Sequence, residues 1–152
     1  MTDYKEINLQ LKSLIQGVPH RIANLANASA LIFNSLEGLN WAGFYMLEGD
    51  KLILGPFQGK TACIEIPVGK GVCGTAVAER RTQLVPDVHA FPGHIACDSV
   101  SNSEIVIPLF DGDEVVGVLD IDSPHFDRFT EADREGLEEF AEILCRELFG
   151  KD

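Results

Sequence analysis

The stretch SEIVIPLFDGDEVVGVLDID, residues 103–122, decides the fold, because it reads as two β-strands joined by a tight turn. In both halves, Ser103–Phe110 and Glu114–Asp122, side chains alternate in the manner of strands whose two faces differ. Asp111-Gly112-Asp113 separates the halves and has the composition of a hairpin loop. The stretch therefore predicts an antiparallel pair of strands.

Three acidic residues of this hairpin are expected on one face of the sheet. Alternation puts Asp120 and Asp122 on the same face of the second strand. A three-residue loop sets Phe110 opposite Glu114 and therefore Glu104 opposite Asp120, whereas a slip by one residue would put the acids among core side chains. Three acids that face one another repel, so at least one should have a raised pKa and be able to donate a proton near neutral pH. The alternative is a solvated face on which the acids are independent.

The segment before the hairpin contains most of the side chains with reactive chemistry. It opens with GKGVCG, residues 69–74, which leads into a short helix. Pro86–Asn102 has no periodicity, and a structureless loop of this length is uncommon in a compact domain unless it has a function. Cys97 lies in this loop, close before Glu104. Thiols, histidines and an acid gathered around one loop suggest thiol chemistry.

Two histidines precede Cys97 and affect the reactivity expected of its thiol. A charged His89 or His94 nearby would lower the thiol pKa, whereas Asp98 works in the other direction, so the thiolate fraction stays open. A zinc site formed by His89, His94 and Cys97 is an alternative. Its spacing matches no familiar zinc signature, and the loop has no CxxC pair.

The other three cysteines have different expected environments. Cys73 begins a short helix, whose N-terminal dipole favours a thiolate. Cys63 opens a predicted strand. Cys145 lies on or beside the apolar stripe of the last helix and is expected to be a buried small hydrophobe. The alternative for Cys63, Cys73 and Cys97 is that they are unrelated reduced thiols.

Periodicity in the rest of the chain predicts two helices before the sheet and one after it. The last helix begins with Thr130 as N-cap and Asp133 at the capping-box position. The order of elements fits an α+β fold, in which an antiparallel sheet has helices packed on one side. The predicted elements are helices 4–14 and 20–36, strands 41–46, 51–54 and 63–68, a short helix that ends near residue 78, strands 83–85, 103–110 and 114–122, and a helix 130–149.

Composition limits the class of protein. A chain of 152 residues is long enough for one domain with a full core. The formal net charge of -12 disfavours nucleic acid and anionic membranes as partners. No apolar run approaches the roughly 20 residues that cross a bilayer, and the amino terminus has no signal-peptide pattern. These features predict a cytoplasmic protein, in which cysteines are more often free, catalytic or metal-binding than structural bridges.

Four segments carry a family resemblance: WAGFY at 41–45, GKGVCGTA at 69–76, HIACDSVSNSEIVIPL at 94–109 and GVLDIDSP at 117–124. Together they resemble the free methionine-(R)-sulfoxide reductases, small cytosolic enzymes that consist of one GAF domain. The resemblance extends over nearly the whole chain and includes three cysteines that most GAF domains lack. It implies a single GAF domain over residues 1–152, with helices on one side of a central antiparallel sheet and a substrate pocket on the other.

The resemblance implies roles for the cysteines. Cys97 would be the nucleophile that attacks the sulfur of free methionine-R-sulfoxide, after which methionine leaves and the cysteine becomes a sulfenic acid. A second cysteine would condense with it to a disulfide, with Cys63 as the first choice and Cys73 as the alternative. Thioredoxin is implied as the electron donor, with no bound cofactor and no metal.

The resemblance also implies how the substrate is bound. Glu104, Asp120 and Asp122 match the acidic residues that bind the sulfoxide oxygen and the polar groups of the substrate. A neutral acid there would protonate the sulfoxide oxygen as the thiolate attacks. Trp41 matches the aromatic residue that packs on the substrate's methyl group, the alternative being a plain core tryptophan. Family members are often dimers, which makes a homodimer a further expectation.

The rival interpretation is a non-catalytic sensor, because the GAF fold hosts many functions. Such a module would bind a cyclic nucleotide or another small metabolite. No effector domain or signalling helix is expected at either end of the chain, so a sensor would have to act by association. The cysteines and the acidic face favour the reductase.

Overall fold

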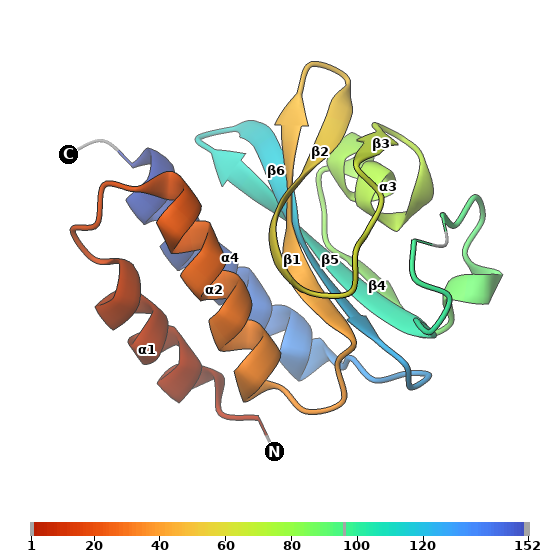
Figure 1. The fold of residues 1–152 in the computed structure, drawn as a ribbon, viewed down its shortest axis with the longest axis horizontal. Coiled ribbons are helices and arrows are strands. Elements are labelled where there is room, and N and C mark those ends of the chain that lie inside the picture. The colour runs from red at the N-terminus through yellow and green to blue at the C-terminus, as the bar shows by residue number, and fades with distance from the viewer. Residues whose placement is uncertain (1, 96, 151–152) are drawn as a thin grey trace.

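The computed structural model describes residues 2–95 and 97–150, which form a six-stranded antiparallel sheet with helices on both faces (Figure 1). The strand order is β3-β2-β1-β6-β5-β4. Within these residues, no helix has the length and apolar character needed to span a membrane. The elements are α1 (Tyr4–Ile15), α2 (Arg21–Ser35), β1 (Trp41–Glu48), β2 (Lys51–Gly59), β3 (Glu65–Pro67), α3 (Gly71–Glu79), β4 (Gln83–Val85), a short 3₁₀ helix (Val88–Ala90), β5 (Ser103–Asp111), β6 (Glu114–Ser123) and α4 (Glu131–Phe149).

The two faces of the sheet are covered by different helices. α1, α2 and α4 lie together on one face, and α3 lies on the other (Figure 1). Ile105 and Leu119 pack with Leu137 of α4 in the helix-side core. Val106 and Val118 belong instead to a second apolar cluster on the α3 side. The predicted α+β fold is confirmed, and the structure adds that α3 helps to build the pocket face.

The β5–β6 hairpin has a two-residue turn instead of the predicted three-residue loop. Asp111 pairs with Glu114, and the register shifts between Leu109 and Phe110, which marks a β-bulge. A two-residue turn alone would have placed the acids on the core side, as the alternation argument anticipated. The bulge moves the register by one residue and thereby keeps them together on one face.

The same bulge changes which acids are neighbours. Glu104 pairs with Asp122, and Asp120 pairs with Val106. The predicted direct pairing of Glu104 with Asp120 is therefore wrong, and Asp120 is the diagonal neighbour of Glu104. The three acids still share one face, because all of them lie in the part of the hairpin beyond the bulge.

Strand β2 continues through Gly55-Pro56, beyond residue 54, where the strand was predicted to end. The β1–β2 register shifts between Gly43 and Tyr45, so that two residues of β2 lie opposite one residue of β1. This irregularity absorbs the proline, and β2 runs on to Gly59. The connection from β2 to β3 therefore starts at the end of the sheet where Trp41 lies, since Trp41 pairs with Gly59.

Helix α4 begins with the predicted capping box. The Thr130 hydroxyl accepts from the backbone N–H of Asp133 at 3.3 Å, and the Asp133 carboxylate accepts from the backbone N–H of Thr130 at 2.8 Å. The Tyr4 hydroxyl donates to the same carboxylate at 2.6 Å. The cap thus also fastens α1 to α4.

Candidate functional site

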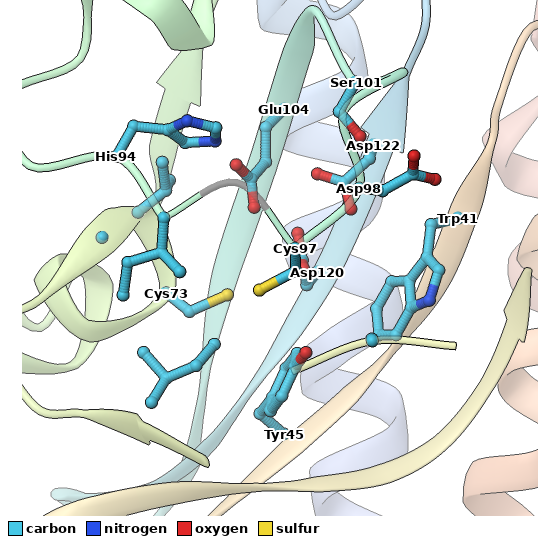
Figure 2. A pocket seen from close by; sticks show the side chains of 15 residues that line it. Trp41, Tyr45, Cys73, His94, Cys97, Asp98, Ser101, Glu104, Asp120 and Asp122 are labelled. Atoms are coloured by element: carbon cyan, nitrogen blue, oxygen red, sulfur yellow. The ribbon is translucent and has the colours of Figure 1, made fainter. Parts of the chain in front are cut away.

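A pocket lies on the α3 face of the sheet, between the ends of β1, β5 and β6 and the loop that contains Cys97 (Figure 2). The side chains come from strands that are distant in sequence, which the register brings together. The predicted site residues that line it are Trp41, Cys73, Cys97, Glu104, Asp120 and Asp122.

The remaining predicted residue, Cys63, is joined to the pocket by a disulfide with Cys97. Their Cα atoms are 5.4 Å apart, across a separation of 34 residues. Both cysteines are partly exposed. Cys63 does not open β3 as predicted, because that strand begins at Glu65. The interpretation of Cys63 and Cys97 as unrelated reduced thiols does not describe this structure.

The three acids of the pocket are buried. Glu104 and Asp120 are each 6% exposed and Asp122 is 9% exposed, so the alternative of a solvated face is wrong. Burial and then repulsion from the other two acids raise the pKa of Glu104 well above its usual range. Burial likewise raises the pKa of Asp122 well above its usual range, with repulsion from Asp120 adding to it, and burial raises the pKa of Asp120. The pocket therefore favours neutral carboxylic acid.

Cys73 lies in the first turn of α3 and is buried against this cluster. Burial and then the charges of Asp120 and Glu104 raise the pKa of the Cys73 thiol well above its usual range. The predicted thiolate at this helix start is thus wrong, because burial and the acids outweigh the helix dipole. The Cys73 sulfur and one carboxylate oxygen each from Glu104 and Asp120 lie within 4.8 Å of one another.

Two aromatic side chains of β1 form a wall of the pocket. Trp41 stacks on Tyr45 with ring centroids 5.8 Å apart, and its Nε1 donates to the Lys60 carbonyl at 3.0 Å. Tyr45 lines the pocket and donates through its hydroxyl to the Cys63 carbonyl at 3.1 Å. Tyr45 was not among the predicted residues. Period-2 alternation from Trp41 would have placed it on the same face.

The loop that contains Cys97 is tied to the sheet by Asn40. The Asn40 side-chain amide donates to the Asp98 carboxylate at 3.0 Å and to the Ser101 hydroxyl at 2.9 Å. Its backbone N–H donates to the Asp122 carbonyl at 3.0 Å. The sequence offered no pattern that singles out Asn40, because its partners are about sixty residues away.

The alternative zinc site of His89, His94 and Cys97 is not supported. The Cys97 sulfur is bonded to Cys63, and His89 Nε2 lies 2.9 Å from the Asn102 side-chain oxygen. His94 lines the pocket, and partial burial lowers its pKa. Cys145 packs against the helix-side core but is only partly buried, whereas a buried side chain was expected, and burial raises its pKa to about 11.

Comparison with known proteins gives a family match for the chain. The model of the GAF domain family matches residues 23–144. A protein of Escherichia coli strain K12 named free methionine-R-sulfoxide reductase is 53% identical over 149 residues, which cover 98% of this chain and 90% of that protein.

Two solved structures are closely similar. The reduced form of fRMsr from Staphylococcus aureus has a TM-score of 0.95 at 56% identity and covers 97% of this chain and 96% of its own. Free methionine-R-sulfoxide reductase from Neisseria meningitidis, in complex with its substrate, has a TM-score of 0.92 at 46% identity and covers 95% of this chain and 87% of its own. The pocket-lining residues all fall inside the range matched by the family model.

Proposed function

The chain belongs to the free methionine-R-sulfoxide reductases, which are built on a GAF domain, and we propose that it reduces free L-methionine-(R)-S-oxide to methionine. The observation that carries the proposal is the Cys63–Cys97 disulfide at a pocket that contains three buried acids. Reduction of a sulfoxide by thiols needs two sulfurs that can join in a disulfide and a proton source for the departing oxygen. This pocket contains both.

In the proposed reaction, the Cys97 thiolate attacks the substrate sulfur while a buried carboxylic acid protonates the sulfoxide oxygen. The attack forms a bond between the Cys97 sulfur and the substrate sulfur. The hydroxyl group then passes from the substrate sulfur to the Cys97 sulfur as this bond breaks, so that methionine leaves and Cys97 becomes a sulfenic acid. A second thiol then attacks the Cys97 sulfur and releases water, which leaves a disulfide. The methionine sulfur gains two electrons, and the two cysteine sulfurs together lose two.

We assign the second thiol to Cys63 first and to Cys73 as the alternative. The disulfide in the structure supports Cys63. Cys73 is buried, and its raised pKa reduces its thiolate fraction and hence its rate of attack. Both assignments are open to direct test.

The acids and the aromatic wall are proposed to orient the substrate. Glu104 and Asp122 are the proposed proton donors, because their surroundings favour the neutral form most strongly. Oδ1 of Asp120 is buried and without a hydrogen-bond partner among the described residues, so it can accept from the polar groups of the substrate. Trp41 is proposed to pack on the substrate's methyl group and thereby to distinguish the epimers by shape.

The electron donor is proposed to be thioredoxin, and the compartment the cytoplasm. A partly exposed disulfide supports an external thiol as the donor, since thiol–disulfide exchange requires the attacking thiolate to reach a sulfur. A single domain over the whole chain remains an expectation, as does a homodimer, which gel filtration with light scattering would check.

A coupled assay tests the function. With thioredoxin, thioredoxin reductase and NADPH, the purified protein should oxidise NADPH when free methionine-R-sulfoxide is added, and much more slowly with the S epimer. Failure to oxidise NADPH with the R epimer would contradict the proposal. Calorimetric binding of a cyclic nucleotide, without thiol-dependent turnover, would favour the sensor instead.

Three variants test the roles of the thiols. Cys97→Ser should release no methionine, whereas Cys63→Ser should still release one methionine per active site in a single turnover. Cys145→Ser is the matched control and should keep full activity, because Cys145 packs on the opposite side of the sheet. Equal and complete loss in the first two variants would remove the assignment of roles and leave the activity standing.

A further inference from the structure

Three side chains of the pocket are placed so that they can hold a metal ion. The Cys73 sulfur and one oxygen each from Glu104 and Asp120 all lie within 4.8 Å of one another, and all three residues are buried. In Figure 2 Glu104 lies above Cys73, and Cys97 lies between Cys73 and Asp120 in this view; all four line the same pocket. We propose that they form a binding site for a thiophilic divalent cation such as Zn²⁺.

No fixed positive charge opposes a cation in the described part of this pocket. Among the described residues that line it there is no Lys or Arg, and the ion pairs found in the described part of the chain include none of its acids. Oδ1 of Asp120 is a buried acceptor without a partner there. A bound cation would give this oxygen a partner and would offset the repulsion between the carboxylates.

The ligand atoms select the kind of cation. Zn²⁺ binds cysteine sulfur, histidine nitrogen and carboxylate oxygen, commonly with three protein ligands and one open position. Mg²⁺ and Ca²⁺ prefer oxygen alone, so a cysteine ligand disfavours both. Water can occupy the fourth position and complete the tetrahedron.

None of the three proposed ligands takes part in the disulfide. Cys73 is free, whereas Cys63 and Cys97 are bonded to each other. A cation bound to Cys73 and Glu104 would occupy the space proposed for the sulfoxide oxygen and would replace the proton on Glu104. Zn²⁺ and methionine sulfoxide therefore exclude each other. This mutual exclusion, unlike the metal site itself, rests on the proposed function.

Cobalt is the direct probe, because a cysteine–Co²⁺ bond gives a charge-transfer absorption that carboxylates alone do not. Untagged protein, reduced with a phosphine that does not chelate, should bind one equivalent of Co²⁺ with this absorption, and Zn²⁺ should displace it. The Cys63→Ser/Cys97→Ser double variant should behave in the same way. Cys73→Ser should lose the absorption, and Cys145→Ser, which removes the other free cysteine, should keep it.

A second variant covers the case in which Cys73→Ser fails to fold by circular dichroism. Glu104→Gln should weaken Co²⁺ binding by at least about tenfold, since even outer-shell partners of metal ligands contribute that much. An absent charge-transfer band, or one unchanged in Glu104→Gln and Cys73→Ser, would overturn the site.

Activity separates the two proposals. Zn²⁺ should raise the apparent KM for methionine-R-sulfoxide in the wild-type protein, and EDTA should reverse the effect. A protein that binds Co²⁺ through Cys73 but has no reductase activity would refute the proposed function and leave the metal site. Reductase activity without the Co²⁺ band would refute only the metal site.

Discussion

Glu104 is a carboxylic acid whose surroundings favour its neutral form. It is buried, lies opposite Asp122 and is the diagonal neighbour of Asp120. Burial comes first and the charges of the other two acids second in raising its pKa. Because the three carboxyls interact, they release protons as a group, and the first deprotonation makes the others harder. In the sequence Glu104 is one acid in an alternating strand, whereas in the structure it belongs to a cluster of three acids that titrate together.

The first prediction concerns the proton that Glu104 holds. Glu104→Gln should lower kcat by about 10²- to 10⁴-fold, the usual contribution of a general acid. In the wild-type protein kcat should fall as the pH rises through the raised pKa, since the donor loses its proton there. The variant should lose much of this alkaline fall. The measurement is a pH profile of kcat with EDTA present, and Glu139→Gln, an exposed acid of α4, is the control. An unchanged kcat in Glu104→Gln would assign the proton to another group.

At this scale the sequence predicted which acids meet and that at least one of them has a raised pKa, but it did not predict the ionisation of Cys73. Alternation correctly placed Glu104, Asp120 and Asp122 on one face, because that face is a property of neighbouring residues. Their burial depends on α3 and on the Cys97 loop, whose positions against the sheet cannot be predicted from the sequence pattern alone. The ionisation of Cys73 was predicted wrongly for the same reason, since the helix dipole is local and burial is not.

At the scale of elements, the hairpin shows a further limit of sequence reasoning. Loop composition suggested three residues, and the structure has two residues plus a bulge between Leu109 and Phe110. The two solutions leave the same side chains on the same face, so hydrophobic alternation does not distinguish them. They differ in which residue lies opposite Glu104. The short helix α3 was predicted from its sequence, but its position on the pocket face comes from tertiary packing.

The second prediction concerns the tie between β1 and the Cys97 loop. Asn40→Ala removes the donors to Asp98, which directly follows Cys97, and to Ser101; both acceptors line the pocket. Two hydrogen bonds contribute about 1 kcal/mol each, so kcat/KM should fall by roughly tenfold or more. The disulfide should also form more slowly after one turnover, as measured by counting the free thiols that remain.

The control for this variant is Asn34→Ala, which removes a side-chain hydrogen bond to Ala30 on the exposed face of α2. It should leave kcat/KM and the rate of disulfide formation unchanged. If Asn40→Ala matched it in both measurements, the tie would have no part in the reaction.

At the scale of the whole molecule, the sheet separates stability from chemistry. The larger apolar core lies between the sheet and α1, α2 and α4, and it includes fully buried side chains such as Leu11, Ile121 and Phe140. The opposite face combines a smaller apolar cluster with buried acids and a free thiol. Burying acids without a cation partner lowers the stability of the folded protein. Burial of the helix-side core offsets this loss of stability.

This division leads to the third prediction, in which one variant changes stability and activity in opposite directions. The folded-state pKa of Glu104 is raised, so the folded protein holds a proton that the unfolded chain releases at about pH 4.3. The stability contribution of this group is fully present below that pH and is lost as the pH rises through the folded-state pKa. Glu104→Gln removes this loss, and its amide can donate to the neighbouring carboxylates. If the gain at pH 8 is about 1 kcal/mol, Tm should rise by about 2–4 °C.

The measurement is thermal unfolding of both proteins between pH 5 and pH 9 with EDTA present. The Tm difference between Glu104→Gln and wild type should grow with pH, whereas Glu139→Gln should track wild type throughout, because exposed substitutions of this kind usually change stability by less than about 0.5 kcal/mol. A Tm of Glu104→Gln that stays below wild type at every pH would mean that the Glu104 carboxyl stabilises the fold instead. A variant that gains stability at high pH and loses turnover would instead mean that the pocket keeps Glu104 for its proton, at the expense of the stability that glutamine would give.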